Sequence, residues 1–131
     1  MAVQPKNNAV GWFEIPTTDM DRAIKFYETV FDLKLERNKV GDLDMAWFPW
    51  VEDGMGASGS LIHDPEHFKP SADGVVIYFT AHSGDLANEL ARVEPAGGKV
   101  IQSKTLITEE IGYFAVFLDP EGNRVALHSR K

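Results

Sequence analysis

One order of secondary-structure signals occurs twice along this chain of 131 residues, and it restricts the fold more than any other feature. Residues 9–15 are aromatic and β-branched, which is typical of a strand. Residues 20–31 carry apolar side chains at three- and four-residue steps, which predicts an amphipathic helix. Residues 74–80 and 85–94 repeat that strand and that helix. Three further strand-like runs follow each helix, so each half has the order strand, helix, strand, strand, strand.

The spacing of matching residues supports an internal duplication. Asp19 and His63 lie 44 residues apart in the first half, and Asp85 and His128 lie 43 apart in the second. A repeat of about 60 residues would hardly bury its own sheet. We therefore predict that the two halves share one core.

We predict a single domain, residues 1–131, made of a first module (residues 9–68) and a second module (residues 74–129). The side chain of Thr18 or Asp19 is expected to cap the first helix. The other strands are expected at residues 33–39, 43–50 and 58–63 in the first module, and near 99–103, 112–118 and 123–129 in the second.

Charge and composition exclude several classes of partner. The chain has 20 acidic and 13 basic residues, and this net charge of −7 argues against the basic surface that a nucleic acid requires. The absence of cysteine excludes disulfides and thiolate metal sites. No apolar run approaches the roughly 18 residues of a membrane span, and the first residues lack the apolar core of a signal peptide. We therefore expect a cytoplasmic protein that binds neither nucleic acid nor a membrane.

Two motif matches lack the structural context that their chemistry requires. Residues 54–59 fit G-x-G-x-x-G, but we expect a strand after them and not a helix. We interpret them as a loop able to close over a pocket. Residues 63–67 fit the zinc-protease pattern H-x-x-E-H, but Pro65 would leave His63 outside any helix. No G-x-S-x-G sequence is present, so a serine nucleophile is not indicated.

The sequence Asp-Pro-Glu-Gly at residues 119–122 predicts a type I turn. Asp suits the first position of such a turn, Pro the second and Gly the fourth. The turn should join the strands expected at residues 112–118 and 123–129. We therefore expect the main role of this segment to be structural, as a turn between two strands.

Two segments resemble a known superfamily. VGWFEIPTTDMDRAIKFYETVF (residues 10–31), GYFAVFLDPEGNRVALHS (residues 112–129) and the duplicated order of elements resemble the vicinal oxygen chelate superfamily of glyoxalase I, bleomycin-resistance proteins and extradiol dioxygenases. The resemblance implies an α+β fold in which two tandem βαβββ modules form a curled, eight-stranded mixed sheet. This sheet would enclose a ligand cup, with the helices outside. It also implies a homodimer, with sites close to the subunit interface.

The resemblance also shows what this chain lacks. Metal-dependent members use His, Gln or Glu at positions that correspond here to Trp12, Leu61, Tyr78 and Ala126. Tryptophan, leucine and alanine do not chelate a divalent ion, and tyrosine does so poorly. We therefore expect no cofactor at the usual position.

A displaced site two residues further along each strand is the alternative. Because side chains alternate along a strand, Glu14 should share a face with Trp12, His63 with Leu61 and His128 with Ala126. Glu14, His63 and His128 could hold a divalent ion such as Zn, Fe, Ni or Mn. Without a metal, Glu14 could act as a general base beside His128. Ordinary structural pairing of these three side chains remains the third interpretation.

An aromatic cup is the more general expectation. Aromatic rings offer flat surfaces for a planar small molecule, and the candidates are Trp12, Trp47, Trp50, Tyr78, Tyr113 and Phe117. The predicted function is therefore binding of a small organic molecule without the usual metal site. The alternative is a metal-dependent lyase, isomerase or dioxygenase that uses the displaced site, and a module without chemistry is the third hypothesis.

Overall fold

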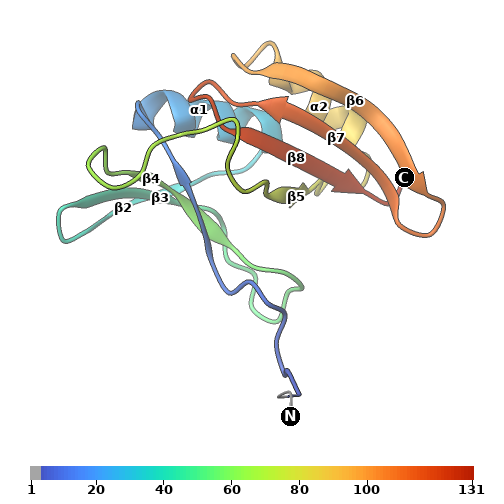
Figure 1. Cartoon of the computed structure of the whole chain (residues 1–131), viewed down its shortest axis with the longest axis horizontal. Helices are drawn as coiled ribbons and strands as arrows, with labels where there is room; N and C mark the ends of the chain where they lie inside the picture. The colour runs from blue at the N-terminus through green and yellow to red at the C-terminus, as the bar shows by residue number, and fades with distance from the viewer. Residues whose placement is uncertain (1–3) are drawn as a thin grey trace.

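The computed structural model describes residues 4–131, which form two helices and eight strands (Figure 1). The elements of the first module are β1 (Phe13–Pro16), α1 (Met20–Phe31), β2 (Glu36–Val40), β3 (Leu43–Trp47) and β4 (Gly59–His63). Those of the second module are β5 (Tyr78–Thr80), α2 (Leu86–Val93), β6 (Lys99–Thr108), β7 (Gly112–Leu118) and β8 (Arg124–Ser129). Each module therefore has the predicted order βαβββ.

The strands form two four-stranded sheets with the same topology. The strand order is β1-β4-β3-β2 in one sheet and β5-β8-β7-β6 in the other. In each sheet the first strand pairs in parallel with the last strand of its module, and the other pairs are antiparallel. The predicted α+β fold of two βαβββ modules is confirmed.

The prediction described a single curled sheet of eight strands, and the structure divides these strands between two sheets. Within residues 4–131 no hydrogen-bonded ladder joins the edge strands β1 and β5. The rings of Phe13 and Phe79 meet edge to face between these strands, with their centroids 5.5 Å apart. The two sheets are therefore joined by side-chain packing.

Both helices lie on the same side of the sheets and contact each other (Figure 1). Each begins after an aspartate that caps it. The side chain of Asp19 accepts a hydrogen bond from the amide of Arg22, and that of Asp85 accepts one from the amide of Ala87. Of the two residues predicted to cap the first helix, Thr18 and Asp19, it is Asp19 that caps α1. Neither helix of the described chain has the length and hydropathy that crossing a membrane requires.

The shared core lies between the helices and the sheets. Buried residues of α1, β4, α2, β7 and β8 form one apolar cluster. Within it, the ring of Phe26 on α1 packs against the ring of Phe117 on β7, with centroids 5.7 Å apart. A fully buried side chain of this size contributes about 1.5–3 kcal/mol to the free energy of unfolding. The two modules are therefore stabilised together, as the length of one repeat had indicated.

Several strand boundaries differ from the prediction. Strand β1 begins at Phe13 and not at residue 9, and β3 ends at Trp47 and not at residue 50. Residues 33–35 are not in a strand, because Leu33 and Leu35 pack against the core and the amide of Leu35 donates to the carboxylate of Glu28 (2.9 Å). Residues 74–77 are not part of a strand, although the carbonyl oxygen of Ile77 accepts a hydrogen bond from the amide of Ala126 (3.0 Å), so β5 is only three residues long. Strand β6 continues to Thr108, well past its predicted end, because it pairs with all of β7.

Gly59 explains the last glycine of the G-x-G-x-x-G match. It opens β4 opposite Phe13, and a Cβ atom there would collide with the Phe13 carbonyl oxygen and ring. The glycine therefore allows β1 to approach β4 closely. This role belongs to the packing of the sheet and does not require a nucleotide.

Candidate functional site

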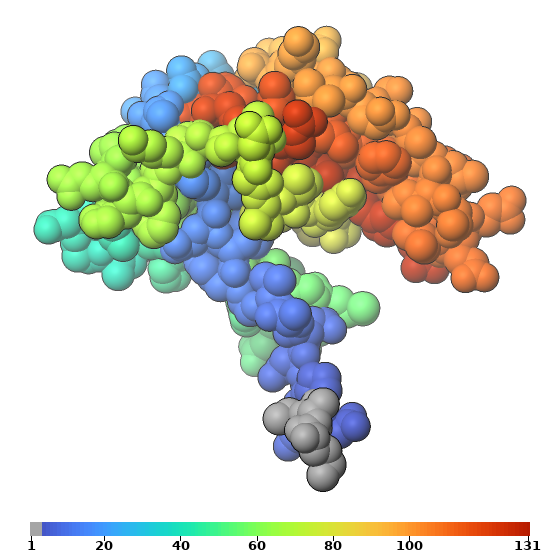
Figure 2. Space-filling view, viewed as in Figure 1, coloured from blue at the N-terminus to red at the C-terminus, as the bar shows by residue number. Residues whose placement is uncertain are grey.

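A cleft of about 840 Å³ lies between the edge strands of the two modules. Its walls come from β1, the loop between β3 and β4 (residues 48–58), the linker between the modules (residues 69–77) and β5. In Figure 2 the molecule is hollowed between the blue N-terminal segment and the yellow-green segment that includes β5. The apolar side chains in its lining include Val10, Trp12, Phe13, Phe48, Trp50, Val51, Met55, Val75, Val76, Tyr78 and Phe79.

Three large aromatic side chains of the lining are exposed. Trp12 is 40%, Trp50 68% and Tyr78 57% exposed. Trp12 packs edge to face against Trp47, with ring centroids 5.8 Å apart and an interplanar angle of 80°. Trp47 does not itself line the cleft, so it supports Trp12 from β3. Flat apolar surface therefore faces the solvent inside the cleft.

Glu14 lies on the face of β1 that is turned away from the helices. It is exposed, lines the cleft and pairs in register with Ser60, whereas its neighbours Phe13 and Ile15 pack in the core. In the second module the equivalent register pair is Thr80 with His128. Glu14 and Thr80 therefore occupy matching places in the two modules, and both line the cleft.

The hydroxyl of Ser60 is buried beside Glu14. It has no hydrogen-bond partner among the described residues. Trp47 is its register neighbour on β3, so the Trp12–Trp47 pair lies on the same face of the sheet. Ser60 therefore lies behind the wall of the cleft and does not line the cleft itself.

The structure does not bring Glu14, His63 and His128 together. The Nδ1 atom of His63 lies 3.0 Å from the carbonyl oxygen of Thr17, and the Nε2 atom of His128 lies 2.7 Å from that of Ile111. Neither histidine lines the cleft. Across residues 4–131 no group of three or more His, Asp or Glu side chains is placed to hold a metal ion.

The face of β4 accounts for the position of His63. Leu61 is fully buried in the core beside the helices, and alternation places His63 on that same helix-facing side. Glu14 and Ser60 lie on the opposite face. His63 and Leu61 therefore share a face, as alternation predicts, but this face is not the one that borders the cleft.

The positions that carry metal ligands in metal-dependent relatives do not fit a metal here. Trp12 and Tyr78 line the cleft, Ala126 is buried beside Tyr78, and Leu61 lies in the core on the other face. Two aromatic and two aliphatic side chains offer no set of donors for a divalent ion. The cleft therefore has the shape of a ligand site without the donors of the usual metal centre.

Two predicted cup residues lie on the helix side of β7. Phe117 is fully buried against Phe26, and Tyr113 packs against the core with the Lys104 ammonium 4.5 Å from its ring centroid. Side-chain alternation gives the reason, because Tyr113, Ala115 and Phe117 share one face of the strand. The predicted cleft positions of Tyr113 and Phe117 are therefore wrong.

Sequence reasoning missed the part of the lining that comes from the linker. Lys69, Val75 and Val76 line the cleft from a segment without periodicity, and Arg124 reaches it from the start of β8. Val75 is 92% exposed, which the alternation of a strand would not have indicated. The sequence pattern had assigned Val75 and Val76 to the strand predicted at residues 74–80, whereas the structure begins β5 only at Tyr78.

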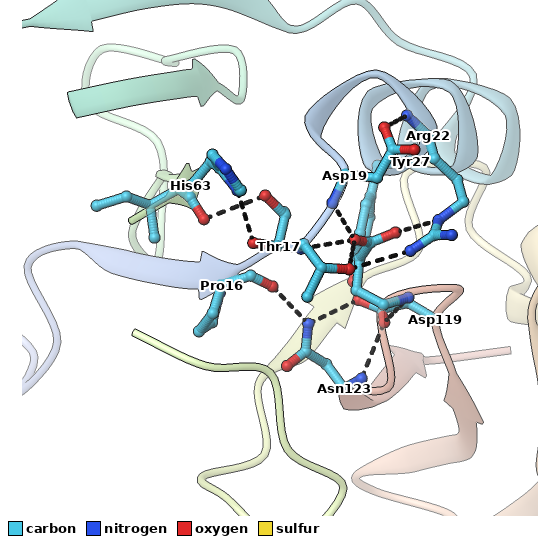
Figure 3. A network of polar contacts seen from close by, with 11 residues as sticks. Pro16, Thr17, Asp19, Arg22, Tyr27, His63, Asp119 and Asn123 are labelled. Carbon is cyan, nitrogen blue, oxygen red and sulfur yellow. Dashed lines mark hydrogen bonds and ion pairs between the residues drawn. The ribbon is translucent and has the colours of Figure 1, made fainter. Parts of the chain in front are cut away.

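A network of hydrogen bonds centred on the corner between β7 and β8 (residues 119–123) holds the cleft walls in place (Figure 3). The carboxylate of Glu121 accepts hydrogen bonds from the amides of Thr18 and Asp19, both at 2.8 Å, and from Nε of Arg22 at 2.7 Å. Burial by itself would raise the pKa of Glu121, but the hydrogen bonds from Arg22, Asp19 and Thr18 outweigh it and lower that pKa. The corner of the second module therefore fixes the start of α1 in the first.

The other side chains of the corner reach β1 and the linker. The hydroxyl of Tyr27 donates to Asp119 (2.6 Å), and Nδ2 of Asn123 donates to the carbonyl oxygen of Pro16 (2.8 Å). The amide of Ser71 donates to Oδ1 of Asn123 (3.2 Å). Burial raises the pKa of Asp119, and burial together with the Asp119 charge raises the pKa of Tyr27 well above its ordinary value. Asn123 therefore joins the end of β1 to the linker.

Two tandem βαβββ modules with a cleft between their edge strands define a class of α+β folds. Residues 9–127 match the family described as the glyoxalase/bleomycin resistance protein/dioxygenase superfamily, and the chain belongs to it. This confirms the resemblance inferred from the two sequence segments. No curated protein matches the chain.

Solved structures share the fold at low sequence identity. A glyoxalase/bleomycin resistance protein from Albidiferax ferrireducens T118 is 16% identical, with a TM-score of 0.69 over 95% of this chain and 100% of that one. TnmS3, an antibiotic binding protein from Streptomyces sp. CB03234, is 21% identical, with a TM-score of 0.63 over 98% and 100%. Glyoxalase I from Zea mays is 20% identical, with a TM-score of 0.65. The match covers 91% of this chain but only 45% of the maize enzyme, so the chain spans less than half of that protein.

Proposed function

We propose that the protein binds a small, largely planar organic molecule in the cleft between its modules, without a metal ion. The observation that carries the proposal is the exposure of Trp12, Trp50 and Tyr78 inside a cleft of about 840 Å³. That volume lies within the range of roughly 300–1,000 Å³ that is typical of small-molecule sites. Exposed aromatic side chains lose water-accessible apolar surface when a flat ligand covers them, which favours binding.

The polar groups of the lining would orient such a ligand. Glu14 supplies an exposed carboxylate as a hydrogen-bond acceptor, and Thr80 supplies a hydroxyl at the matching place of the second module. A few polar groups in an apolar cleft are the usual source of ligand specificity. TnmS3, which shares this fold, is an antibiotic binding protein, and this supports the choice of a binding function.

We also propose that the protein acts as a homodimer. Apolar side chains outside the cleft are exposed on β2, β6 and the turn after β6, namely Val40, Ile101, Leu106, Ile107 and Ile111. Strands β2 and β6 are the outer edge strands of the two sheets, and an edge strand with exposed apolar side chains can pair with another copy of the chain. Analytical ultracentrifugation of the purified protein tests this point, and a sedimenting species of 14.6 kDa would contradict it.

A fluorescence titration with N-phenyl-1-naphthylamine, an uncharged probe made of a naphthyl and a phenyl group, tests the binding function. We expect saturable binding at one site per chain. The Trp12→Ala and Trp50→Ala variants should each weaken it about fivefold, since each removes an aromatic surface worth about 1 kcal/mol. Phe68→Ala is the matched control, because Phe68 is 40% exposed but does not line the cleft. Binding that is unchanged in both tryptophan variants would contradict the proposal.

Elemental analysis tests the metal-free part of the proposal. The protein is purified without a metal-affinity tag, and the Glu14→Ala variant is prepared in parallel. We expect less than stoichiometric zinc, iron, nickel and manganese in both preparations. A stoichiometric metal that is lost in the variant would instead support the metal-dependent lyase, isomerase or dioxygenase.

A further inference from the structure

Two cations line one end of the cleft. Lys69 lies on the linker and Arg124 opens β8, and both contribute to the lining. Asn123, the residue before Arg124, accepts a hydrogen bond from the amide of Ser71, two residues after Lys69 (3.2 Å). This contact brings the linker against the start of β8. The two cations therefore approach the cleft from adjoining segments.

The guanidinium of Arg124 is held in place with most of its donors unused. Its Nε atom donates to the carbonyl oxygen of Ala72 (3.0 Å), which fixes the direction of the side chain. Its two terminal nitrogens make no hydrogen bond to any of residues 4–131. An arginine has five N–H donors, and the terminal pair matches the two oxygens of an anionic group such as a carboxylate. Arg124 is thus oriented by the protein but not neutralised by it.

The two buried carboxylates of the corner are engaged elsewhere. Glu121 is bound by Arg22 and by the start of α1, and Asp119 is bound by Tyr27. Neither of them lines the cleft. The acids that do line it, Glu14 and Asp53, form no ion pair with Lys69 or Arg124 within the described part of the chain. Two cations without acidic partners therefore face the same end of the cleft in a protein of net charge −7.

We propose that Lys69 and Arg124 form a subsite for an anionic group, such as a carboxylate or sulfonate, on the aromatic ligand of the cleft. The inference rests on the proposed binding function and names the chemical class of its ligand. The rings lie against the exposed aromatic side chains, and the anionic group lies between the linker and the start of β8. A charge-assisted, bidentate hydrogen bond from Arg124 makes this contact stronger than one between neutral groups.

Two probes that differ by one anionic group test the subsite. N-phenyl-1-naphthylamine is uncharged, and 8-anilinonaphthalene-1-sulfonate adds a sulfonate to the same rings. Dissociation constants of both are measured for the native protein and for Arg124→Met, Lys69→Met and Arg130→Met. Arg130 is exposed and does not line the cleft, so it is the matched control. Arg124→Lys keeps the charge and shows whether the bidentate geometry is needed.

We expect Arg124→Met and Lys69→Met each to weaken sulfonate binding on the order of fivefold to tenfold. Binding of the uncharged probe should change less than twofold in the same variants, which also shows that the cleft is intact. Added salt should weaken binding of the sulfonate and leave the uncharged probe unaffected. Equal affinities for the sulfonate in all variants, with both probes bound, would overturn the subsite alone. Failure of both probes to bind in the native protein would overturn the binding function together with the subsite.

Discussion

The loop between β3 and β4 and the corner between β7 and β8 join equivalent strands of the two modules, but they differ in length and burial. The loop has eleven residues, 48–58, and its segment 49–56 is exposed. The corner has five, 119–123, and the side chains of Asp119, Glu121 and Asn123 are buried. Most of the loop lines the cleft, whereas the corner reaches the cleft only through Asn123 and bonds to the other module. One connection therefore stabilises the domain, and its counterpart is available for a ligand.

Replacement of Glu121 should give the largest effect on stability. Glu121→Ala leaves the amides of Thr18 and Asp19 at the start of α1 without their acceptor and removes the partner of Arg22. We expect the free energy of unfolding to fall on the order of 3 kcal/mol, measured by urea denaturation. Glu52→Ala in the exposed loop is the matched control and should change stability by less than about 0.5 kcal/mol. Similar losses in the two variants would remove the proposed difference between corner and loop.

A matched pair of tyrosines gives the next effect. Tyr27→Phe removes a buried hydrogen bond to Asp119 but keeps the ring in the core, so we expect a loss of about 1–2 kcal/mol in the free energy of unfolding. Tyr78→Phe in the cleft should leave stability almost unchanged, because Tyr78 is mostly exposed. Thermal unfolding of both variants checks the pair. The result to look for is a lower melting temperature for Tyr27→Phe only.

The pH dependence of the corner should be the smallest effect. Because the folded-state pKa of Glu121 is lowered from its ordinary value of 4.5, its charge stabilises the fold above that pH. This contribution is lost as the pH falls through the lowered pKa. The difference in free energy of unfolding between the native protein and Glu121→Gln should therefore be full at neutral pH and shrink below pH 4.5. Urea denaturation at a series of pH values measures it.

Asp119 does not disturb that comparison. Its pKa is raised by burial, so its contribution has the opposite sign: it is present at low pH and lost as the pH rises. Both proteins contain Asp119, so this contribution largely cancels in the difference. A difference that stays constant from neutral to acid pH would show that the charge of Glu121 does not stabilise the corner.

The duplicated fold could be predicted because its signals are local. The cap at Asp19 and the three- and four-residue steps of apolar side chains in α1 both depend on residues close together in the sequence. The turn predicted at the corner is likewise local, and it is confirmed by the hydrogen bond from the amide of Gly122 to the carbonyl oxygen of Asp119 (3.1 Å). Of the predicted aromatic residues, Trp12, Trp50 and Tyr78 line the cleft. Their strand or loop positions place them at the edges where the modules meet.

The rest of the candidate site depends on contacts that sequence patterns do not record. Which face of β4 borders the cleft is fixed by its register with β1, so the direction of His63 could not be read from alternation alone. The positions of Lys69 and Arg124 depend on the path of the linker across the corner. That path is set by hydrogen bonds between segments about 50 residues apart in the sequence, such as Arg124 to Ala72.

The bonds from Glu121 to the start of α1 have a consequence for the order in which the chain folds during synthesis. The acceptor is made 102 residues after the amide of Asp19 and 103 after that of Thr18. A ribosome releases the chain from its N-terminus, so α1 leaves the ribosome long before the carboxylate that completes its first turn. Contacts of such long separation also slow folding. We therefore expect the first module to reach its final stability only when the last two strands have been synthesised.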